Sequence, residues 1–505
     1  MTALMEVDVA GGIGPGVAAA ENASHTLHRL TSHEAAWYEA YRSRPDADWS
    51  APVNDSRVLD LRTNDEARFP WFYKRYAEPL PRVPLPRDLP PTTAPAVEVL
   101  AGSADVAPAD LDLPGLARLL YLSAGVVRTM QRPARTWLFR AAGSAGGRFP
   151  LELYVAAPEG SAVSAGVHWY DPEEHALVQV GPPPQTGAVT IVVTGIPWRT
   201  GWRYRERGYR HIYWDAGTAL AQLLAAAESA GIGARFFTGF ADAAVAALVG
   251  ADRVHEFPVA VVALEDGVPA VEPAGPATRG MVDAAPLEFP LVTAAQRAGE
   301  QDTLGTAWDS AGAATASAQS SGPVEEVVLR RGSQRRMDPS RGLPGNVLHT
   351  CLEAALRGIG LPHFVAVHQV DGIAPGLYRW PDMSAPARPG DMRDEMYWVC
   401  LEQALGRDAA FVVISAVDVA RLSDREYREA QLAAGLVEGR LHLLAYGLGA
   451  GASGMTFLDS EIPALVGEPL DGLLFTCIGV PAYASARGGL PGAPTAVGHV
   501  RPAAS

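Results

Sequence analysis

The chain has 505 residues and is acidic, with 41 lysine and arginine side chains against 56 aspartate and glutamate side chains. A net charge of −15 argues against a general nucleic-acid binder, because neutralising phosphate needs a basic surface. No apolar run is long enough to span a membrane, and the three scattered cysteines suggest neither a disulfide framework nor a metal site. We therefore expect a cytoplasmic protein of two or three domains without a bound metal.

The first 95 residues give few signals of regular structure. Residues 1–25 are rich in glycine and alanine and lack the basic segment of a secretory signal, so we expect them to be disordered. A short helix is predicted near residues 34–41. Prolines recur from residue 78 to residue 95, and this stretch is predicted to be an extended arm.

A first folded domain is predicted over residues 96–266. Apolar residues at helical spacing predict one helix over 113–130 and another over 211–230, which ends at a glycine. Alternating and β-branched apolar residues predict strands over 151–157, 165–170, 188–194 and 257–264.

A second domain is predicted over residues 326–492, after a linker and before a short tail. Residues 267–325 have no periodicity and are rich in alanine, glycine, proline and serine, as is typical of a linker. The tail covers residues 493–505. Strands are predicted over 364–370, 376–380, 411–415 and 473–480.

The second domain repeats landmarks of the first at nearly constant spacing. The first set is Tyr209-Arg210, Gly217, Gly231, Phe240-x-Asp242 and Leu248-Val-Gly250. The second set is Tyr427-Arg428, Gly435, Gly449, Phe457-x-Asp459 and Leu465-Val-Gly467, with a gap of one residue before Phe457. This regularity predicts a tandem duplication and hence a pseudo-dimer within one chain.

Two basic turns, one in each half, carry the chemistry. The first runs Arg140-Ala-Ala-Gly-Ser144-Ala145-Gly146-Gly-Arg148, and its small residues let backbone N–H groups converge on an anion. The second runs Arg331-Gly-Ser333-Gln-Arg335, and its guanidinium groups can bind phosphate oxygens. Each turn alone could equally be structural or a solvated basic segment. Together they predict one phosphate site between the two halves.

These motifs resemble those of the flavin-dependent nitroreductase superfamily. The SagB-type dehydrogenases, which oxidise azoline rings in ribosomally made peptides, are the most similar subgroup. The shared features are Phe139-Arg140-Ala-Ala-x-Ser144, Pro150-Leu-Glu152-Leu-Tyr154, Tyr204-x-Glu206-Arg207-x-Tyr209-Arg210 and Arg331-x-Ser333-x-Arg335. The resemblance covers residues 110–266 and 326–490 and implies an α+β fold, with two nitroreductase-like domains, each a mainly antiparallel sheet flanked by helices.

The resemblance implies FMN as the cofactor, bound jointly by two subunits in such proteins. Here each half lacks the motif that the other keeps. Residues 97–103 stand where the first half would need its Arg-x-Ser-x-Arg, and residues 344–349 stand where the second half would need its serine turn. We therefore predict one FMN per chain. The predicted cofactor-binding residues are Arg331, Ser333, Arg335, Ser144, Ala145, Gly146, Arg140, Arg148, Gly451, Ser453, Gly454 and Arg487.

The predicted catalytic residues are Tyr204 and Arg203. They stand where the subgroup has a Lys-Tyr pair, and because arginine does not lose its proton, Tyr204 becomes the candidate general base or acid. Arg203 is expected to lower the pKa of Tyr204 electrostatically. The stripe of Trp214, Leu220 and Leu224 is interpreted as core or interface.

Three functions remain open at this stage. The first is azoline dehydrogenation in a modified peptide delivered by cyclodehydratase or leader-binding proteins. The second is NAD(P)H-dependent reduction of nitro compounds or quinones. The third is a non-catalytic partner in a peptide-tailoring complex. A monomer or a homodimer is compatible with each.

Overall fold

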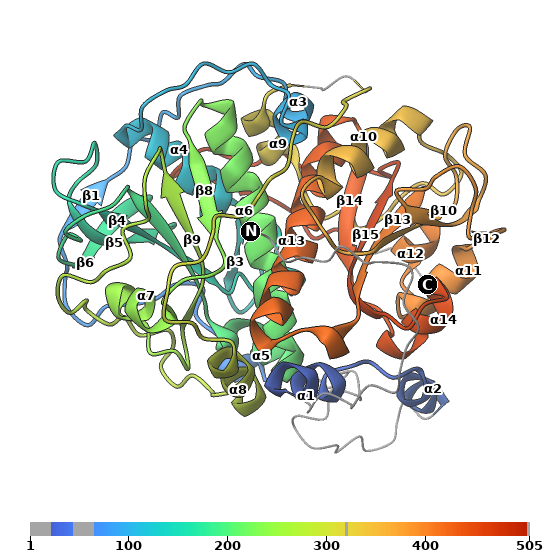
Figure 1. Ribbon diagram of the computed structural model, residues 1–505, viewed down its shortest axis with the longest axis horizontal. Coiled ribbons are helices and arrows are strands. Elements are labelled where there is room, and N and C mark those ends of the chain that lie inside the picture. The colour runs from blue at the N-terminus through green and yellow to red at the C-terminus, as the bar shows by residue number, and fades with distance from the viewer. Residues whose placement is uncertain (1–21, 44–64, 319–321, 502–505) are drawn as a thin grey trace.

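The computed structural model describes residues 22–43, 65–318 and 322–501. Of the residues 1–25 that were expected to be disordered, 1–21 lie outside these ranges. For residues 23–25 the expectation is wrong, because they begin the helix α1 (Ala23–Leu30). The described chain forms two halves, each built on an antiparallel sheet, and two long helices lie side by side between them (Figure 1). The expected class of antiparallel sheets flanked by helices is confirmed.

The sheet of the first half has seven strands in the order β1-β6-β5-β4-β7-β9-β8, all paired antiparallel. Its strands are β1 (Arg82–Pro84), β4 (Leu151–Ala157), β5 (Gly166–Asp171), β6 (Ala176–Gly181), β7 (Thr190–Gly195), β8 (Ala234–Phe237) and β9 (Phe257–Leu264). The predicted strands are confirmed within two residues. The proline-rich arm supplies the edge strand β1, a position where the missing N–H groups of proline are tolerated.

The sheet of the second half has six strands in the order β12-β11-β10-β13-β15-β14. Its strands are β10 (His363–Val367), β11 (Gly376–Trp380), β12 (Arg388–Pro389), β13 (Phe411–Val417), β14 (Gly451–Met455) and β15 (Asp471–Gly479). The two sheets place equivalent segments alike: β8 pairs with β9 as β14 pairs with β15.

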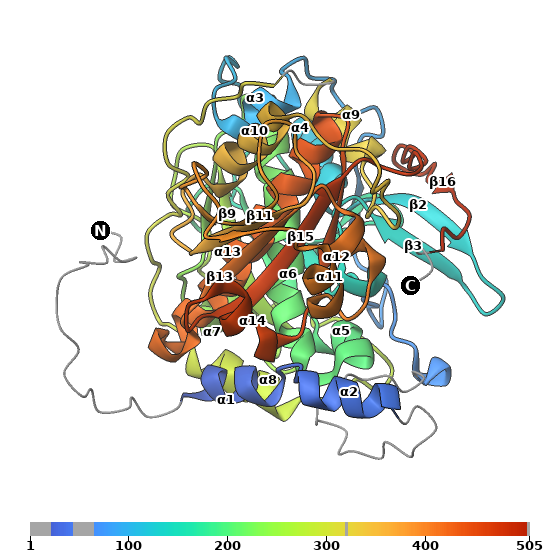
Figure 2. The ribbon, with the colours of Figure 1, turned by 90° about the vertical axis from the view of Figure 1, so that its right-hand side faces the viewer.

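A small third sheet belongs to the first half and interrupts a predicted helix. The helix expected over 113–130 ends early, as α4 (Leu113–Ala124), and Gly125 leads into β2 (Val126–Gln131). Strand β2 pairs with β3 (Thr136–Arg140) and with β16 (Thr495–Ala496), so part of the predicted tail joins this sheet. Figure 2 shows these strands projecting from one side of the molecule.

The two halves meet where α6 (Gly208–Ser229) crosses α13 (Asp424–Gly447). A methyl group on Gly217 would lie 2.3 Å from the carbonyl oxygen of Leu432, and one on Gly435 would lie 2.3 Å from that of Trp214. The repeated glycines are therefore the points at which the two backbones touch. No side chain fits between them.

The other repeated residues bind each other across the same crossing. Arg210 and Arg207 donate to the buried carboxylate of Asp459, at 2.7 and 2.8 Å. In the same way, Arg428 and Arg425 of the second half donate to Asp242 of the first, at 3.0 and 2.9 Å.

The tyrosines of the repeated Tyr-Arg pairs lie between these two clusters. The rings of Tyr209 and Tyr427 stack with only 2° between their planes and 6.4 Å between their centroids. The repeated tyrosines, arginines and aspartates of one half therefore contact the repeated residues of the other half.

The predicted linker contains a further repeated element. Helix α8 (Pro290–Ala298) is buried against the first half, and the carbonyl oxygen of Gly299 accepts from Arg425. Helix α1 (Ala23–Leu30) precedes Thr31, whose carbonyl oxygen accepts from Arg207 in the same way. Figures 1 and 2 show α1 and α8 next to each other at one end of the molecule. Part of residues 267–325 therefore packs into the folded structure as helix α8. This helix was not predicted from the sequence, because small and polar residues alternate in it.

The remaining helices cover the sheets and fill the seam. They are α2 (Ala35–Ser43), α3 (Ala96–Ala101), α5 (Pro197–Tyr204), α7 (Asp242–Val249), α9 (Val324–Arg330), α10 (Gly345–Leu356), α11 (Arg393–Val399), α12 (Ala404–Asp408) and α14 (Ile462–Val466). The predicted helices at 34–41 and 211–230 correspond to α2 and α6. Within the described part of the chain, every helix is too short or too polar to cross a bilayer.

We predict that Gly217→Ala destabilises the protein strongly, because its methyl group would meet backbone atoms that cannot rotate away. Overpacking of this kind costs ~1–3 kcal/mol, which thermal unfolding would detect. Gly312→Ala is the matched control, since a methyl group there meets nothing within 4 Å. Equal melting temperatures for the two variants would contradict the close crossing.

Candidate active site

The two basic turns from opposite halves are in contact. Nη2 of Arg331 donates to the carbonyl oxygen of Ala141, which belongs to the first turn. A methyl group on Gly143 would lie 3.3 Å from Nη1 of the same arginine. The two turns therefore face each other across the seam between the halves.

Two cavities adjoin at these turns. The first, which we name the seam cavity, has a volume of about 570 Å³ and lies between α6, α13, β14 and the loop before α12. The second, the hairpin cavity, has a volume of about 670 Å³ and lies against β2 and β3. Both are lined by Gly143, Ser144, Gly146, Ser333 and Arg335. The shared turns make the two cavities neighbouring parts of one site.

Arg331 provides donors that nothing in the described chain satisfies. Its side chain is only 3 % exposed, yet Nε and Nη1 have no hydrogen-bond partner among the described residues. Burial lowers the pKa of Arg331, but a guanidinium keeps its proton at neutral pH. Buried, unpaired donors are costly, so a bound anion would stabilise them.

A second buried arginine, which the sequence did not single out, lies beside it. Nη2 of Arg128 donates to the carbonyl oxygens of Arg331 and Leu329, and Nε donates to that of Ala486. Burial, followed by the charge of Arg331, lowers the pKa of Arg128 to about 10. Arg128 lies on β2, in the stretch predicted to be helical, and this misassignment hid its position.

The first turn is held from behind by a buried carboxyl group of α6. Asp215 accepts from the hydroxyl of Ser144 at 2.5 Å and from the backbone N–H of Ala145 at 3.0 Å. The Ser144 hydroxyl in turn accepts from the N–H of Phe149 at 2.8 Å. The Ser144 hydroxyl and the Ala145 N–H, which the sequence predicted to bind the cofactor, donate to Asp215 and so fix the turn. Gly146 completes it with a left-handed φ of 60°.

Asp215 is unusual because its carboxyl group lines the seam cavity without a cationic partner in the described chain. Burial raises its pKa to about 7, although the bonds from Ser144 and Ala145 act in the opposite direction. The carboxyl group therefore gains and loses its proton near neutral pH.

The opposite wall of the seam cavity carries an ionised carboxylate. Glu438 accepts from the hydroxyl of Thr218 at 2.7 Å, and Nδ1 of His442 lies 2.6 Å from its other oxygen. Burial alone would raise the pKa of Glu438, but the charge of His442 and these contacts hold it below its usual value. Nε2 of His442 faces the carbonyl oxygen of Ala452, so both ring nitrogens meet acceptors.

Tyr204 lines the seam cavity, and Arg203 acts to lower its pKa, as expected. Burial outweighs the charges of Arg203 and Arg148, however, so the net shift of the pKa is upward. The ring lies 4.1 Å from that of His211, centroid to centroid, and a methyl group on Gly146 would reach its hydroxyl. Tyr204 therefore holds its proton at neutral pH and is a donor rather than a base.

Three of the predicted arginines are paired with groups of the protein itself, although Arg140 also lines the hairpin cavity. Arg140 donates to the carbonyl oxygens of Leu151 and Phe72, and Arg148 lies among the aromatic rings of Phe69, Trp137 and Trp202. Arg487 is exposed, pairs with Glu326 at 2.8 Å and lines neither of the two cavities. Their side chains are engaged within the protein.

The predicted residues of β14 lie at the far wall. Ser453 and Gly454 line the seam cavity, and Gly451 is buried at the start of the strand, against Gln334. The interpretation of Trp214 as core was incomplete, because it also lines the seam cavity. His211, Trp214, Asp215 and Thr218 share one face of α6, and this spacing was the available signal.

Comparisons with known proteins agree with this fold. Residues 137–267 match the model of the Nitroreductase family. A protein of Methanocaldococcus jannaschii named as a nitroreductase is 26 % identical over 164 residues, covering 30 % of this chain and 78 % of its own.

Two solved structures extend the comparison. A protein from Anabaena variabilis described as a nitroreductase covers 88 % of this chain and 99 % of its own, with 23 % identity and a TM-score of 0.65. A chain of the Escherichia coli microcin synthetase McbBCD complex covers 48 % of this chain and 91 % of its own, with 16 % identity and a TM-score of 0.27. The Anabaena structure establishes a nitroreductase-like fold over most of the chain.

We predict that Asp215→Asn changes how stability depends on pH. A raised carboxyl pKa means that the folded state binds the proton more tightly, so Asp215 costs stability as pH rises from about 4 to about 7. The asparagine variant avoids this cost. Its free energy of unfolding relative to the native protein should rise across that range, by up to ~4 kcal/mol.

Glu206→Gln is the control for this experiment. Burial raises the pKa of Glu206 to about 7 as well, but the residue does not line the seam cavity. Like Asp215→Asn, this variant should gain free energy of unfolding relative to the native protein as pH rises, as measured by urea unfolding. A difference between Asp215→Asn and the native protein that stays constant from pH 4 to pH 8 would contradict the assignment.

Proposed function

We propose that the chain is an FMN-dependent oxidoreductase that dehydrogenates azoline rings of a ribosomally made peptide. The observation that carries the cofactor assignment is the pair of buried, unpartnered donors on Arg331, where the two turns meet. A phosphate group supplies the acceptors that these atoms lack. The azoline substrate rests on the resemblance of the motifs around Ser144, Tyr204 and Ser333 to those of the SagB-type dehydrogenases.

The residues present fit FMN. Arg331, Ser333 and Arg335 would hold the phosphate in the hairpin cavity, with Arg128 adding positive charge behind them. The ring system would lie in the seam cavity, near Ser453 and Gly454. When bound, FMN supplies hydride acceptance and donation, which no amino-acid side chain can provide.

The two halves would form a covalently joined pseudo-dimer with this one site. The reciprocal contacts of Arg210 with Asp459 and of Arg428 with Asp242 support this arrangement. At the position equivalent to the Arg331 turn, the first half ends α3 with Gly102-Ser103 and has no arginine. In the second half, residues 344–349 are not a turn, as expected, but the beginning of the helix α10, and only residues 357–362 connect this helix to β10.

The chain also provides the groups that a dehydrogenation needs for its proton. Removing hydride from one carbon requires that a neighbouring proton be taken by a base, and the best base has a pKa near the working pH. Asp215 satisfies that condition, since its pKa is about 7. Tyr204, whose pKa is raised and whose hydroxyl lies beside Gly146, would orient the substrate or donate a proton.

The second candidate is an NAD(P)H-dependent reductase of nitro compounds or quinones, which the nitroreductase name of the Methanocaldococcus relative favours. Rapid bleaching of the flavin by NADPH would favour this activity. Loss of two hydrogens from a thiazoline or oxazoline peptide, read by mass spectrometry with cyclodehydratase or leader-binding partners present, would favour the first. A non-catalytic partner would do neither.

We predict that Arg331→Gln lowers FMN affinity at least tenfold, because a charge-assisted phosphate contact contributes ~1.5–3 kcal/mol. Ser333→Ala should weaken binding less. Fluorescence titration of the protein with FMN measures both. Arg487→Gln is the control, since that guanidinium pairs with Glu326 outside the cavities. If Arg331→Gln and Arg487→Gln bind FMN equally well, the proposed phosphate site is wrong.

We predict that Tyr204→Phe lowers turnover by ten- to a hundredfold while FMN content stays the same, because only the hydroxyl at the cavity wall is lost. Steady-state kinetics with the flavin absorbance recorded in parallel would measure this. Unchanged turnover would remove Tyr204 from the catalytic residues.

A further inference from the structure

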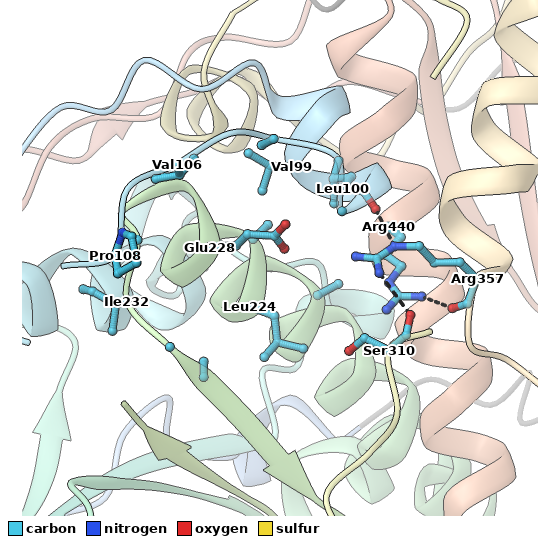
Figure 3. A pocket seen from close by; sticks show the side chains of 17 residues that line it. Val99, Leu100, Val106, Pro108, Leu224, Glu228, Ile232, Ser310, Arg357 and Arg440 are labelled. Carbon is cyan, nitrogen blue, oxygen red and sulfur yellow. Dashed lines mark hydrogen bonds between the residues drawn. The ribbon is translucent and has the colours of Figure 1, made fainter. Parts of the chain in front are cut away.

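A third cavity of about 390 Å³ lies beside the crossing of α6 and α13, between α3, the C-terminal half of α6 and Arg440 of α13 (Figure 3). Its walls come from α3, α6 and the segment after α6, and Val99, Leu224 and Ile232 give them an apolar part beside polar groups. At one end lie two arginines, Arg357 and Arg440. We name it the arginine cavity.

This cavity occupies the place that the internal repeat relates to the cofactor site. The 218-residue offset between Gly217 and Gly435 pairs Leu224 with His442 and Glu228 with Tyr446. His442 contacts the seam-cavity residue Glu438. The position that the repeat relates to the cofactor site therefore also has a cavity, but different side chains line it.

The lining no longer suits FMN. A methyl group on Gly102 would lie 2.9 Å from the guanidinium carbon of Arg357, so this side chain fills the space beside the end of α3. Arg357 is fixed there by donating from Nε to the carbonyl oxygen of Leu100 and from Nη1 to that of Ser310. The remaining hollow is smaller than the seam cavity.

Both arginines nevertheless have donors to spare. Arg440 is 5 % exposed and uses Nη1 for the carbonyl oxygens of Ala355 and Arg357. Its Nε and Nη2, and Nη2 of Arg357, have no partner among the described residues. Two neighbouring guanidinium groups repel each other, and burial together with this repulsion lowers the pKa of Arg440 to about 9.

One carboxyl group faces the pair without neutralising it. Glu228 is the only acidic residue in the lining. Burial raises the pKa of Glu228, although the charges of Arg357 and Arg440 act in the opposite direction. The cavity thus combines two cations, one carboxyl group of weakened acidity and an apolar wall.

We propose that the arginine cavity binds a small organic anion, with a carboxylate or phosphate group on the two arginines and an apolar body against Leu224 and Ile232. The site is separate from the cofactor site, and its occupation does not depend on the flavin. An anion there satisfies the free guanidinium donors and relieves their mutual repulsion.

The test uses the full chain, with or without flavin, and two probes with the same body, benzoate and phenyl phosphate. Isothermal titration calorimetry should show binding of at least one of them. The probe that binds with the higher affinity shows whether the site prefers a carboxylate or a phosphate group. Benzamide, which has the same body without the charge, should bind at least tenfold more weakly. The flavin spectrum, recorded in parallel, separates binding here from displacement of FMN.

Two variants with opposite expected effects on the affinity for the anion test whether the anion binds in this cavity. Arg357→Gln should weaken the anion at least tenfold, and Glu228→Gln should strengthen it severalfold by removing the opposing carboxyl group. Arg487→Gln should leave it unchanged. The proposal is overturned if neither anion binds at millimolar concentration, if benzamide binds equally well, or if Arg357→Gln and Glu228→Gln both bind as the native chain does.

Discussion

The crossing of α6 and α13 is the constraint on which the rest of the structure depends. Two backbones can touch only where both lack side chains, and Gly217 and Gly435 provide this on both helices. The contact sets the distance between the halves. It therefore also sets the distance between the turn that contains Ser144 and the turn that contains Arg331, which must meet for a joint site to exist.

Buried charge fixes the orientation of the same crossing. Asp459 and Asp242 each lie between two arginines of the opposite half, and removing one partner would leave a buried charge unpaired. The pKa of Asp459 is held far below its usual value by Arg207 and Arg210 despite its burial. Such pairs tolerate only one arrangement of the halves, so they specify the seam more than they strengthen it.

The repeated residues at the crossing of α6 and α13 are alike in both halves, but the cavities beside the crossing are not. The crossing residues are repeated because both halves need them, whereas the cavity residues differ because each cavity faces its own loops. At one, the β2–β3 hairpin and the first turn cover Arg331. At the other, the short connection after α10 brings Arg357 against Gly102. One seam thus carries a polar site of cofactor size and a smaller cationic one.

The sequence by itself determined the repeat and the strands, because these depend on local periodicity and on glycine and arginine at fixed spacing. It did not reveal α8, whose apolar face is made of only a few small residues, nor the end of α4 before β2. Only the tertiary structure decided which charges are neutralised.

Arg140 and Arg148 stand beside the Ser144 turn in the sequence, yet Arg140 donates to carbonyl oxygens and Arg148 lies among aromatic rings. The distant Arg128 lines the same hairpin cavity as Arg140, and the distant Asp215 lines the seam cavity. Burial and long-range contacts set the protonation of Tyr204 and Asp215, and neither can be read from neighbours along the chain.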